Sequence, residues 1–415
     1  MKNMAHLGIS RLEEPMLTGK TLVLGVTGSI AAYKMANVAS MLVKLNADVH
    51  VIMTKNATNF INPIAFETLT GHKCLVDTFD RNFEFNVEHV SLAAKADLFL
   101  IAPASANIIG KIACGIADDM LSTTVMAAKC PVLLSPAMNT NMYENPIVQR
   151  NLNTLKEYGY HIIEPDCGRL ACGTSGAGKL PSEDVLVDNI IYHIAKEKDM
   201  AGINVLVTAG PTREAIDPVR FITNHSTGKM GYAIARMATL RGANVTLVSG
   251  PVNIAPPSHC NVVNIESAND MYREVTKISD ACDIIIKCAA VADYRPAVIQ
   301  SEKIKKSEGE ASLMLERTND ILKYLGEHKK DGQLICGFSM ETENVIENSR
   351  AKLTKKNADM IAANSIKDEG AGFGHETNRI TLITRESEKS LPLMSKTKAA
   401  DIILDELMNM RNTQS

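Results

Sequence analysis

The stretch TLVLGVTGSIAAYKMANVASMLVKLNADVHVIMT (residues 21–54) decides the fold expected for the N-terminal half. Its ends, TLVLGVT (21–27) and DVHVIMT (48–54), are short, apolar and rich in β-branched residues, which favours buried strands. Between them, apolar residues recur at three- and four-residue spacing, which indicates a helix. A strand, a tight turn, a helix and a second strand form a right-handed βαβ unit and therefore predict a parallel sheet.

The alternation of strand and helix patterns continues through the first half of the chain, and a second such series follows. DLFLIAP (97–103) and PVLLSPA (131–137) extend the first sheet, and their continuous apolar character predicts helices on both faces. A second series follows: NVLVTAG (204–210), NVTLVSG (244–250), NVVNIES (261–267), DIIIKCAAV (283–291), LICGFS (334–339) and MIAANS (360–365). We therefore expect an α/β protein with two parallel-sheet, three-layer domains. The expected division is an extension over 1–18, a first domain over 19–190 and a second over 191–415.

Composition excludes several classes of protein. A chain of 415 residues is too long for one ordinary core, which favours two domains. The net charge of −3, 4% aromatic residues and no Trp give no basis for nucleic-acid binding. No apolar run approaches the ~20 residues of a membrane span, and none before Leu22 resembles a signal peptide. Nine cysteines without a CxxC pair suit a reducing cytosol, so we expect a cytoplasmic protein.

Polar residues follow all four strands of the first half. In open α/β sheets the ligand lies at the carboxyl ends of the strands. Gly28 and Ser29 follow the first strand at a helix N-terminus, where a phosphate is favoured, although a plain tight turn explains them equally well. Thr54 ends the second strand, and Ser105 and Asn107 follow the third.

Three further residues of the first half have competing interpretations. A lone histidine such as His89 is more often a surface or core residue than a catalytic one, and Asn139 after PAM can simply cap a helix. Cys172 is one of nine cysteines, and buried cysteines are usually inert. The glycines around it indicate an accessible, hinged strap instead. GTSGAGKL (173–180) is not a phosphate loop, because Leu180 stands where Ser or Thr is required.

The second half contains an unusually long loop after its first strand. PTREAIDPVRFITNHSTG (211–228) has 18 residues where a βα loop normally has 2–6, which indicates function. Its Arg220 and Asn224 are suited to holding a carboxylate or phosphate. Asp293 and a lysine cluster follow a later strand end and suit a triphosphate with Mg²⁺, although lysine runs are usually solvated surface.

Seven motifs in order carry a resemblance to a known family: GVTGSIAAYK, APASAN, PAMNTNMY, GRLACGTSGAGK, TAGPTREAIDPVRFITNHSTGKMG, AAVADYRP and KIKK. The chain resembles the bacterial bifunctional flavoproteins of coenzyme A synthesis, in which a phosphopantothenoylcysteine decarboxylase is fused to a phosphopantothenate–cysteine ligase. The likeness extends from about Leu17 to about Met408 and implies a flavodoxin-like FMN-binding domain followed by a Rossmann-like, CTP-dependent ligase domain.

For the first domain, the resemblance implies an FMN site and three catalytic residues. The FMN positions are Gly28, Ser29, Thr54, Ser105 and Asn107. His89 corresponds to the active-site histidine, Asn139 to the asparagine that holds the substrate carboxylate, and Cys172 to the redox cysteine of a flap. The flavin would oxidise the cysteine moiety, CO₂ would leave, and Cys172 would protonate the resulting enethiol for its reduction.

For the second domain, the resemblance implies that the carboxylate of 4′-phosphopantothenate attacks CTP. The products are pyrophosphate and an acyl-cytidylate, from which the amine of cysteine then displaces CMP. Asn224 and Lys303 correspond to catalytic positions. The implied nucleotide and substrate positions are Arg220, Ala290, Asp293, Lys303, Lys305, Lys306 and Phe338. Mg²⁺ or Mn²⁺ is expected with CTP, but the sequence assigns it no ligands.

The sequence disfavours two other functions. A flavin oxidoreductase with an NAD-binding second half is disfavoured because VLVTAGPTRE lacks G-x-G-x-x-G. A non-catalytic regulatory flavoprotein is disfavoured by the joint presence of His89, Asn139 and Cys172. The resemblance also implies a homo-oligomer with trimeric decarboxylase and dimeric ligase contacts, as in a dodecamer; the composition itself indicates no oligomeric state.

Overall fold

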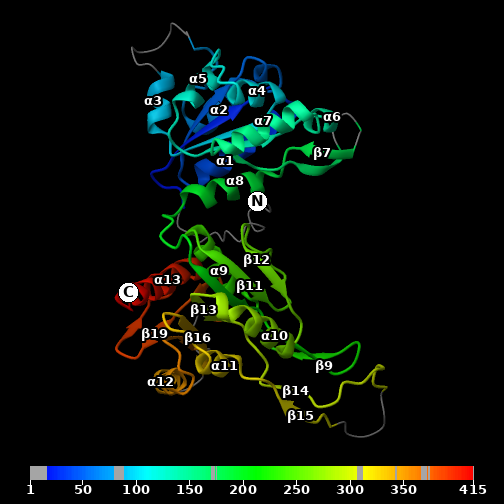
Figure 1. Cartoon of the computed structure of the whole chain (residues 1–415), viewed down its shortest axis with the longest axis vertical. Helices are drawn as coiled ribbons and strands as arrows, with labels where there is room; N and C mark the ends of the chain where they lie inside the picture. Colours follow the sequence, from blue (N-terminus) through cyan, green and yellow to red (C-terminus); the bar gives the residue numbers. More distant parts are fainter. Residues whose placement is uncertain are drawn as a thin grey trace. The chain divides into compact units, whose positions relative to one another are not determined.

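The structure is a computed structural model that describes residues 16–78, 88–169, 173, 175–305, 312–341, 344–365, 372 and 374–414. Contacts divide the chain into two compact units, Glu14–Lys196 and Glu197–Ser415, called here the first and the second unit (Figure 1). Leu17 is fully buried in the first unit, and its backbone N–H donates to Leu45 O. Within the described residues, no helix is both long and apolar enough to cross a membrane.

The first unit is built on a parallel sheet with the order β2-β1-β3-β4-β5. Its strands are β1 (Thr21–Val26), β2 (Asp48–Met53), β3 (Leu98–Ala104), β4 (Val132–Pro136) and β5 (His161–Ile162). The larger helices are α1 (Lys34–Lys44), α2 (Pro63–Thr70), α3 (Glu88–Lys95), α4 (Ala106–Ala113), α5 (Met120–Ala127), α7 (Pro146–Glu157) and α8 (Glu183–Ile194). This is the flavodoxin-like strand order, whose direction of winding reverses between β1 and β3.

Both faces of the first sheet are covered. Alternate strand residues such as Val23, Phe99 and Leu134 pack in one core with apolar residues of α3, α4, α5 and α7. Helices α1 and α8 contact each other and bury further apolar residues. The continuous apolar strands are explained by this arrangement, because each face needs its own apolar side chains.

The second unit has an eight-stranded sheet with the order β12-β11-β8-β13-β16-β17-β19-β20. The parallel part consists of β8 (Asn204–Ala209), β11 (Asn244–Ser249), β12 (Asn261–Asn264), β13 (Ile284–Lys287), β16 (Leu334–Glu341) and β17 (Met360–Ser365). Read from β12, these strands have the Rossmann order 3-2-1-4-5-6, and their winding reverses between β8 and β13. The antiparallel edge consists of β19 (Thr381–Thr384) and β20 (Glu388–Ser390).

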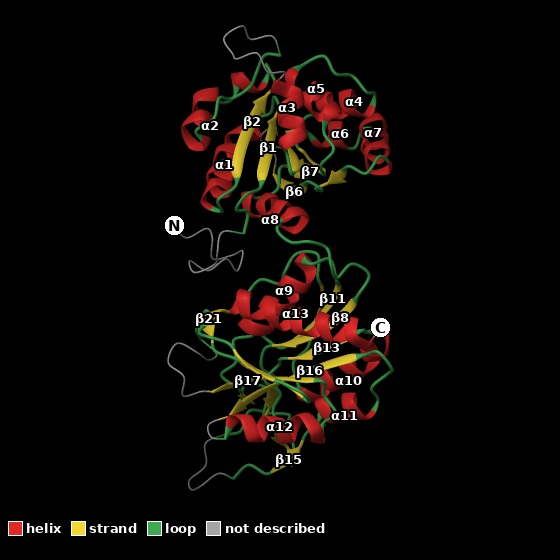
Figure 2. Cartoon of the chain, turned by 90° about the vertical axis from the view of Figure 1, so that its left-hand side faces the viewer, coloured by secondary structure: helices red, strands yellow, loops and turns green. Residues whose placement is uncertain are grey.

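Helices cover this sheet on two sides (Figure 2). One core joins the sheet to α9 (Lys229–Leu240) and α13 (Lys396–Gln414). The other joins it to α10 (Ala268–Ile278), α11 (Ile321–Glu327) and α12 (Val345–Lys355). The predicted fold class, two mostly parallel three-layer α/β domains, is therefore confirmed.

Each of the ten strands predicted from sequence is present, and several short hairpins were not predicted. The 211–228 loop contains an antiparallel pair, β9 (Arg213–Ala215) and β10 (Phe221–Thr223). Other pairs are β6 (Asp166–Arg169) with β7 (Ser175–Lys179), β14 (Tyr294–Pro296) with β15 (Leu315–Arg317), and β18 (Thr377–Asn378) with β21 (Met394–Ser395). Because GTSGAGKL lies largely in β7, it does not form a phosphate loop, as predicted.

Candidate active sites

The first candidate site lies at the carboxyl ends of β1 and β3, where the winding of the first sheet reverses. Buried Thr27 joins the loops that follow the two strands. Its hydroxyl donates to Pro103 O at 2.6 Å and accepts from Ser105 N at 3.0 Å. This pair of bonds brings the segment with Gly28 and Ser29 to the same sheet edge as Ser105. The sequence offered no sign of Thr27 beyond its position at a strand end.

Two predicted serines begin helical segments at this edge. Ser29 caps the short helix η2 (Ile30–Tyr33) and Ser105 caps α4, each accepting a backbone N–H through a long bond of 3.4 to 3.5 Å. Asn107 lies in the first turn of α4. Hydroxyl groups and the free N–H groups of helix N-termini suit a bound phosphate.

Gly28 and Thr54 bring the loops after β1 and β2 together. A Cβ on Gly28 would lie 2.9 Å from Asn56 Cβ, so a larger residue would separate the two loops. The backbone N–H of Thr54 donates to Val26 O, and its carbonyl accepts from Ala57 N. Gly28 is therefore required by close packing whether or not it contacts a ligand.

The β6–β7 hairpin lies against the loop that follows β4. Met138 N donates to Gly178 O at 3.0 Å, and Gly178 has φ +124 with its missing Cβ directed onto Met138 O. A Cβ on Gly176 would lie 2.6 Å from Thr140 Oγ1. Gly176 and Gly178 therefore allow close approach of the hairpin to this loop; their expected role as hinges stays a prediction. Gly173, with φ +88 and open space around it, is a turn glycine.

The remaining predicted residues of the first unit are only partly placed. Asn139 is the N-cap of α6 (Thr140–Tyr143), and its Oδ1 accepts from Asn141 N at 2.9 Å. Next to it, Thr140 Oγ1 is a buried hydroxyl for which the described residues offer no hydrogen-bond partner. Cys172 lies outside the described residues.

His89 is half-buried in the first turn of α3. The far end of this helix is at the amino edge of the sheet, because Lys95 Nζ lies 2.6 Å from an oxygen of Asp48, the first residue of β2. At 1.5 Å per residue, His89 lies about 9 Å along the helix axis toward the strand ends of the site.

The second candidate site lies where β8 and β13 end, at the reversal of the second sheet. Ala290 N donates to Gly210 O at 3.0 Å, and Ala290 O accepts from Thr212 N at 3.2 Å. The same oxygen accepts from Asn224 Nδ2 at 3.0 Å. The predicted residues Asn224 and Ala290 are therefore in direct contact.

Buried Asp217 joins two more of the predicted segments. Its Oδ1 accepts from Val219 N and Arg220 N, both at 2.8 Å, and its Oδ2 from Ile304 N at 3.2 Å. The Arg220 guanidinium lies 3.4 Å from Oδ2. Burial alone would raise the pKa of the Asp217 carboxyl, but these donors outweigh burial and lower it.

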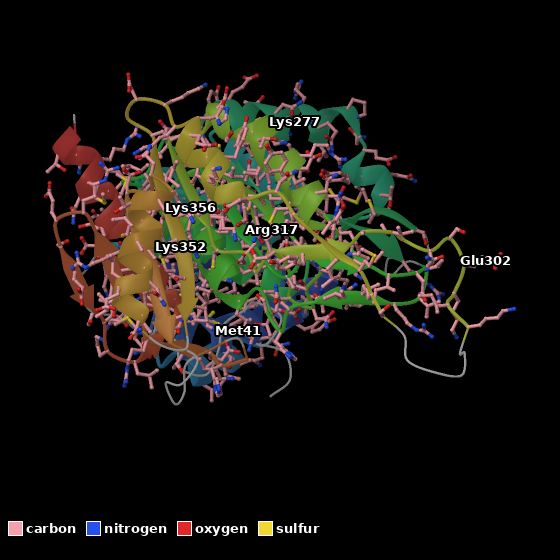
Figure 3. All side chains as sticks on the ribbon, turned by 90° about the horizontal axis from the view of Figure 1, so that it is seen from below. Met41, Lys277, Glu302, Arg317, Lys352 and Lys356 are labelled. Atoms are coloured by element: carbon pink, nitrogen blue, oxygen red, sulfur yellow. The ribbon has the colours of Figure 1, made fainter. Side chains whose placement is uncertain are left out.

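Asp217 thereby places Arg220 beside the exposed residues Lys303 and Lys305, which flank Ile304. The predicted Lys306 lies outside the described residues. The exposed Asp293 is held through its backbone, since Asp293 O accepts from Thr318 N. In Figure 3, Glu302, next to Lys303, lies on a loop that extends from the body of the second unit.

Three lysines of the second unit were missed by sequence reasoning. Lys287 is the last residue of β13, and its Nζ donates to Ala289 O at 3.1 Å. Lys352 donates to Phe338 O at 2.9 Å, and Lys356 pairs with Asp320. Lys352 and Lys356 lie along the same helix, α12 and its C-cap (Figure 3). The four-residue spacing of Lys352 and Lys356, which places two residues on one face of a helix, is the sequence pattern that could have indicated them.

The pKa of Lys287 depends on its burial and on the neighbouring Lys352. Burial first, and the ammonium of Lys352 second, lower the pKa of Lys287 to about 8, although Asp293 and Asp320 act in the opposite direction. Two cations held this close favour an anion between or beside them. The second site is thus cationic, whereas the described part of the first site is formed mainly by neutral hydroxyl, amide and backbone groups.

Comparisons with known proteins identify both halves of the chain. A family model described as Flavoprotein matches residues 10–195, and one described as DNA/pantothenate metabolism flavoprotein C-terminal domain matches residues 200–410. The Coenzyme A biosynthesis bifunctional protein CoaBC of Bacillus subtilis (strain 168) is 47% identical over 396 residues, which cover 94% of this chain and 97% of the relative.

Two further relatives are informative. The protein of the same name from Haemophilus influenzae is 41% identical over 392 residues, covering 94% of this chain and 98% of the relative. A Cysteine/Cysteine sulfinic acid decarboxylase of an unknown prokaryotic organism is 47% identical over 350 residues, covering 83% of this chain and 98% of that protein.

Proposed function

This chain belongs to the family of bifunctional coenzyme A biosynthesis proteins, and we propose that its two strand-end sites divide the two activities of that family between them. The chain ligates 4′-phosphopantothenate with cysteine and decarboxylates the product to 4′-phosphopantetheine. The proposal rests on one observation above all: family positions from distant segments converge at the reversal point of each sheet.

We assign the decarboxylation to the first site, with FMN as its cofactor. When bound there, FMN supplies the oxidation and reduction that the reaction needs. The hydroxyls of Ser29 and Ser105 and the adjoining helix N-termini would hold its phosphate, and the orphan hydroxyl of Thr140 supports a polar ligand near the β4 loop. Thr54 and Asn107 would complete the FMN site, with Gly28 keeping its loops close.

The substrate would be held and protonated by this chain's own residues. Asn139 would donate through its amide to the substrate carboxylate, and His89 would act as a base or orienting group. Cys172 would give a proton to the enethiol left after CO₂ departs. The β6–β7 hairpin supports this role, because it fastens the glycine-rich segment next to Cys172 onto the residue before Asn139.

We assign the ligation to the second site, with CTP as the activating nucleotide. Lys303 and Lys305, together with Lys306, would bind the phosphates and offset charge that develops at the α-phosphate. Arg220 and Asn224 would orient the acyl-cytidylate, with Asp217 holding Arg220 in position. Ala290, Asp293 and Phe338 would bind the nucleotide. Mg²⁺ or Mn²⁺ would accompany the triphosphate, held mainly by its oxygens.

Two of the additional lysines strengthen this assignment. Lys287, at the end of β13, and Lys352, on α12, carry like charges that interact, and a polyanion would relieve their mutual repulsion. The same edge does not resemble a dinucleotide site. In the second unit, β8 leads into the β9–β10 hairpin rather than directly into a helix through a glycine-rich turn.

We also propose that the chain works as a homo-oligomer in the cytoplasm. The second unit exposes a group of large apolar side chains on and around the β9–β10 and β14–β15 pairs: Val219, Phe221, Tyr294, Val298, Met314 and Leu315. Such groups usually mark an interface. They support dimeric ligase contacts; the trimeric decarboxylase contacts and the dodecamer rest on the family resemblance.

The direct test is to incubate the purified protein with CTP, Mg²⁺, cysteine and 4′-phosphopantothenate. We expect CMP and pyrophosphate to form first and CO₂ to follow. A mixture with cysteine as the sole substrate is the control for the activity in the name of one relative, the Cysteine/Cysteine sulfinic acid decarboxylase. CO₂ from cysteine without CTP, with no CMP in the complete mixture, would contradict the assignment and favour a cysteine decarboxylase.

A further inference from the structure

A cluster of possible metal ligands lies at the amino edge of the first sheet, away from the strand ends used by the proposed site. Asp48 begins β2, and His50 stands two residues later, where side chains return to the same face of the strand. His72 follows the C-cap of α2 and comes from a different element. The proposed decarboxylation uses none of these side chains.

The polar atoms of the three side chains lie close together. His72 Nε2 lies 2.7 Å from Asp48 Oδ1, and His50 Nε2 lies 3.3 Å from Asp48 Oδ2. The two imidazole rings are stacked, with centroids 4.1 Å apart and planes 16° from parallel. An imidazole binds a metal ion in its own ring plane, so one ring must rotate out of the stack for both to bind one ion. One ligand atom from each residue lies within 4.8 Å of the other two.

We propose that Asp48, His50 and His72 form a binding site for a divalent transition metal ion, with Zn²⁺ as its preferred occupant. Two imidazoles and one carboxylate are ligands that Zn²⁺ accepts, and three protein ligands leave a coordination position for water. The cluster is half-buried, so an ion can enter from solvent: the side chains of Asp48 and His72 are 32% and 39% exposed. A bound ion would fasten the end of α2 to β2.

Lys95 competes with the metal ion for the carboxylate. Its Nζ lies 2.6 Å from Asp48 Oδ2, and its side chain is 56% exposed. An exposed ion pair of this kind contributes only about 0.2–1 kcal/mol, and the long side chain can turn into water when a divalent ion arrives. Removing the ammonium should therefore strengthen metal binding.

Calorimetric titration with Zn²⁺ of the chelator-treated, full-length protein tests this proposal. The wild type should bind one ion at this site, and His72→Ala or Asp48→Asn should weaken that binding more than tenfold. Lys95→Met should strengthen it up to about fivefold, the size of an exposed ion pair.

The matched control is His161→Ala. His161 and His193 form another ring pair in the same unit, with centroids 4.2 Å apart, and the metal-ligand cluster found among the described residues does not include them. This change should leave the titration as in the wild type. Equal Zn²⁺ binding by His72→Ala, Asp48→Asn and the control would overturn the proposal, as would absence of binding in both the wild type and Lys95→Met.

Discussion

The two units solve the same architectural problem with different chemistry. Each places its candidate site where the winding of a parallel sheet reverses, but the described part of the first is lined mainly by hydroxyl, amide and backbone groups, with a glycine-rich hairpin packed on the loop after β4. The second has Lys287 and Lys352 near each other at the sheet, and Lys303 on a loop that extends from the unit (Figure 3). The comparison shows that the point where a sheet's winding reverses determines only where a site lies. In the proposed assignment, the charge of the ligand, one phosphate for FMN or three for CTP, is matched by the residues around each site.

The largest effect is expected from a substitution that forces the β6–β7 hairpin away from the loop after β4. Gly178→Val adds a side chain at φ +124 and directs it onto Met138 O. We expect the hairpin to be displaced and decarboxylation of supplied 4′-phosphopantothenoylcysteine to fall by about 100-fold or more, as for other misplaced catalytic groups. CO₂ release measures this change.

Gly173→Val is the matched control, because it introduces a positive-φ residue where no atom of the described residues lies within 4 Å. It should cost stability with a smaller loss of decarboxylation, and both variants should keep full ligase activity. Equal CO₂ rates for Gly178→Val and the wild type would show that the hairpin contact does not position the site.

The next effect separates the cationic site from the neutral one. Lys303→Gln removes a charge next to the expected α-phosphate and should lower the rate of CMP release by about 10²-fold, the lower end of the range for losing one charge-stabilising group. Decarboxylation of supplied 4′-phosphopantothenoylcysteine should be unchanged. Lys277→Gln, on an exposed lysine of α10 that is 75% accessible, should change neither rate. If Lys303→Gln abolished both activities, a folding defect would replace the proposed role.

A smaller effect concerns the bond that joins the loops of the first site. Thr27→Val preserves the shape but leaves Pro103 O and Ser105 N without their shared hydroxyl. We expect FMN to bind about tenfold more weakly, in keeping with the loss of buried hydrogen bonds. Fluorescence titration of the stripped protein with FMN measures this change. Thr68→Val, at an exposed threonine of α2, is the control; equal affinities of Thr27→Val and the wild type would remove Thr27 from the account.

The smallest effect is a pH dependence confined to the second site. The folded-state pKa of Lys287 is lowered to about 8 from 10.5, so the unfolded state binds more protons between these values and stability from this group rises with pH there. CTP prefers the charged lysine, so its affinity should fall as pH rises above 8, by up to about tenfold per unit. Calorimetric CTP titrations at several pH values should show less dependence in Lys287→Met. An identical dependence in the variant would contradict this role.

The sheets could be predicted from sequence because buried parallel strands need continuous β-branched segments. The hairpins could not, since REA, YRP and LER are three-residue strands with charged residues, and SGAGK is rich in glycine. The same limit applies to the sites. Ser105 could be predicted from its place after a strand, and Asn224 from the long loop that contains it. Thr27 and Asp217 bind partners 76 and 87 residues away, and such distant contacts leave no local pattern in the sequence.

The most direct test of the division of labour is one assay on three proteins: the wild type, Gly178→Val and Lys303→Gln. Each receives CTP, 4′-phosphopantothenate and cysteine labelled in its carboxyl group, and CMP and labelled CO₂ are measured together. The account predicts both products from the wild type, CMP with little CO₂ from Gly178→Val, and neither from Lys303→Gln. Supplying Lys303→Gln with 4′-phosphopantothenoylcysteine that carries the same carboxyl label should restore labelled CO₂ but not CMP. Loss of CMP in Gly178→Val, or failure of the supplied intermediate to restore CO₂ in Lys303→Gln, would contradict two separate sites.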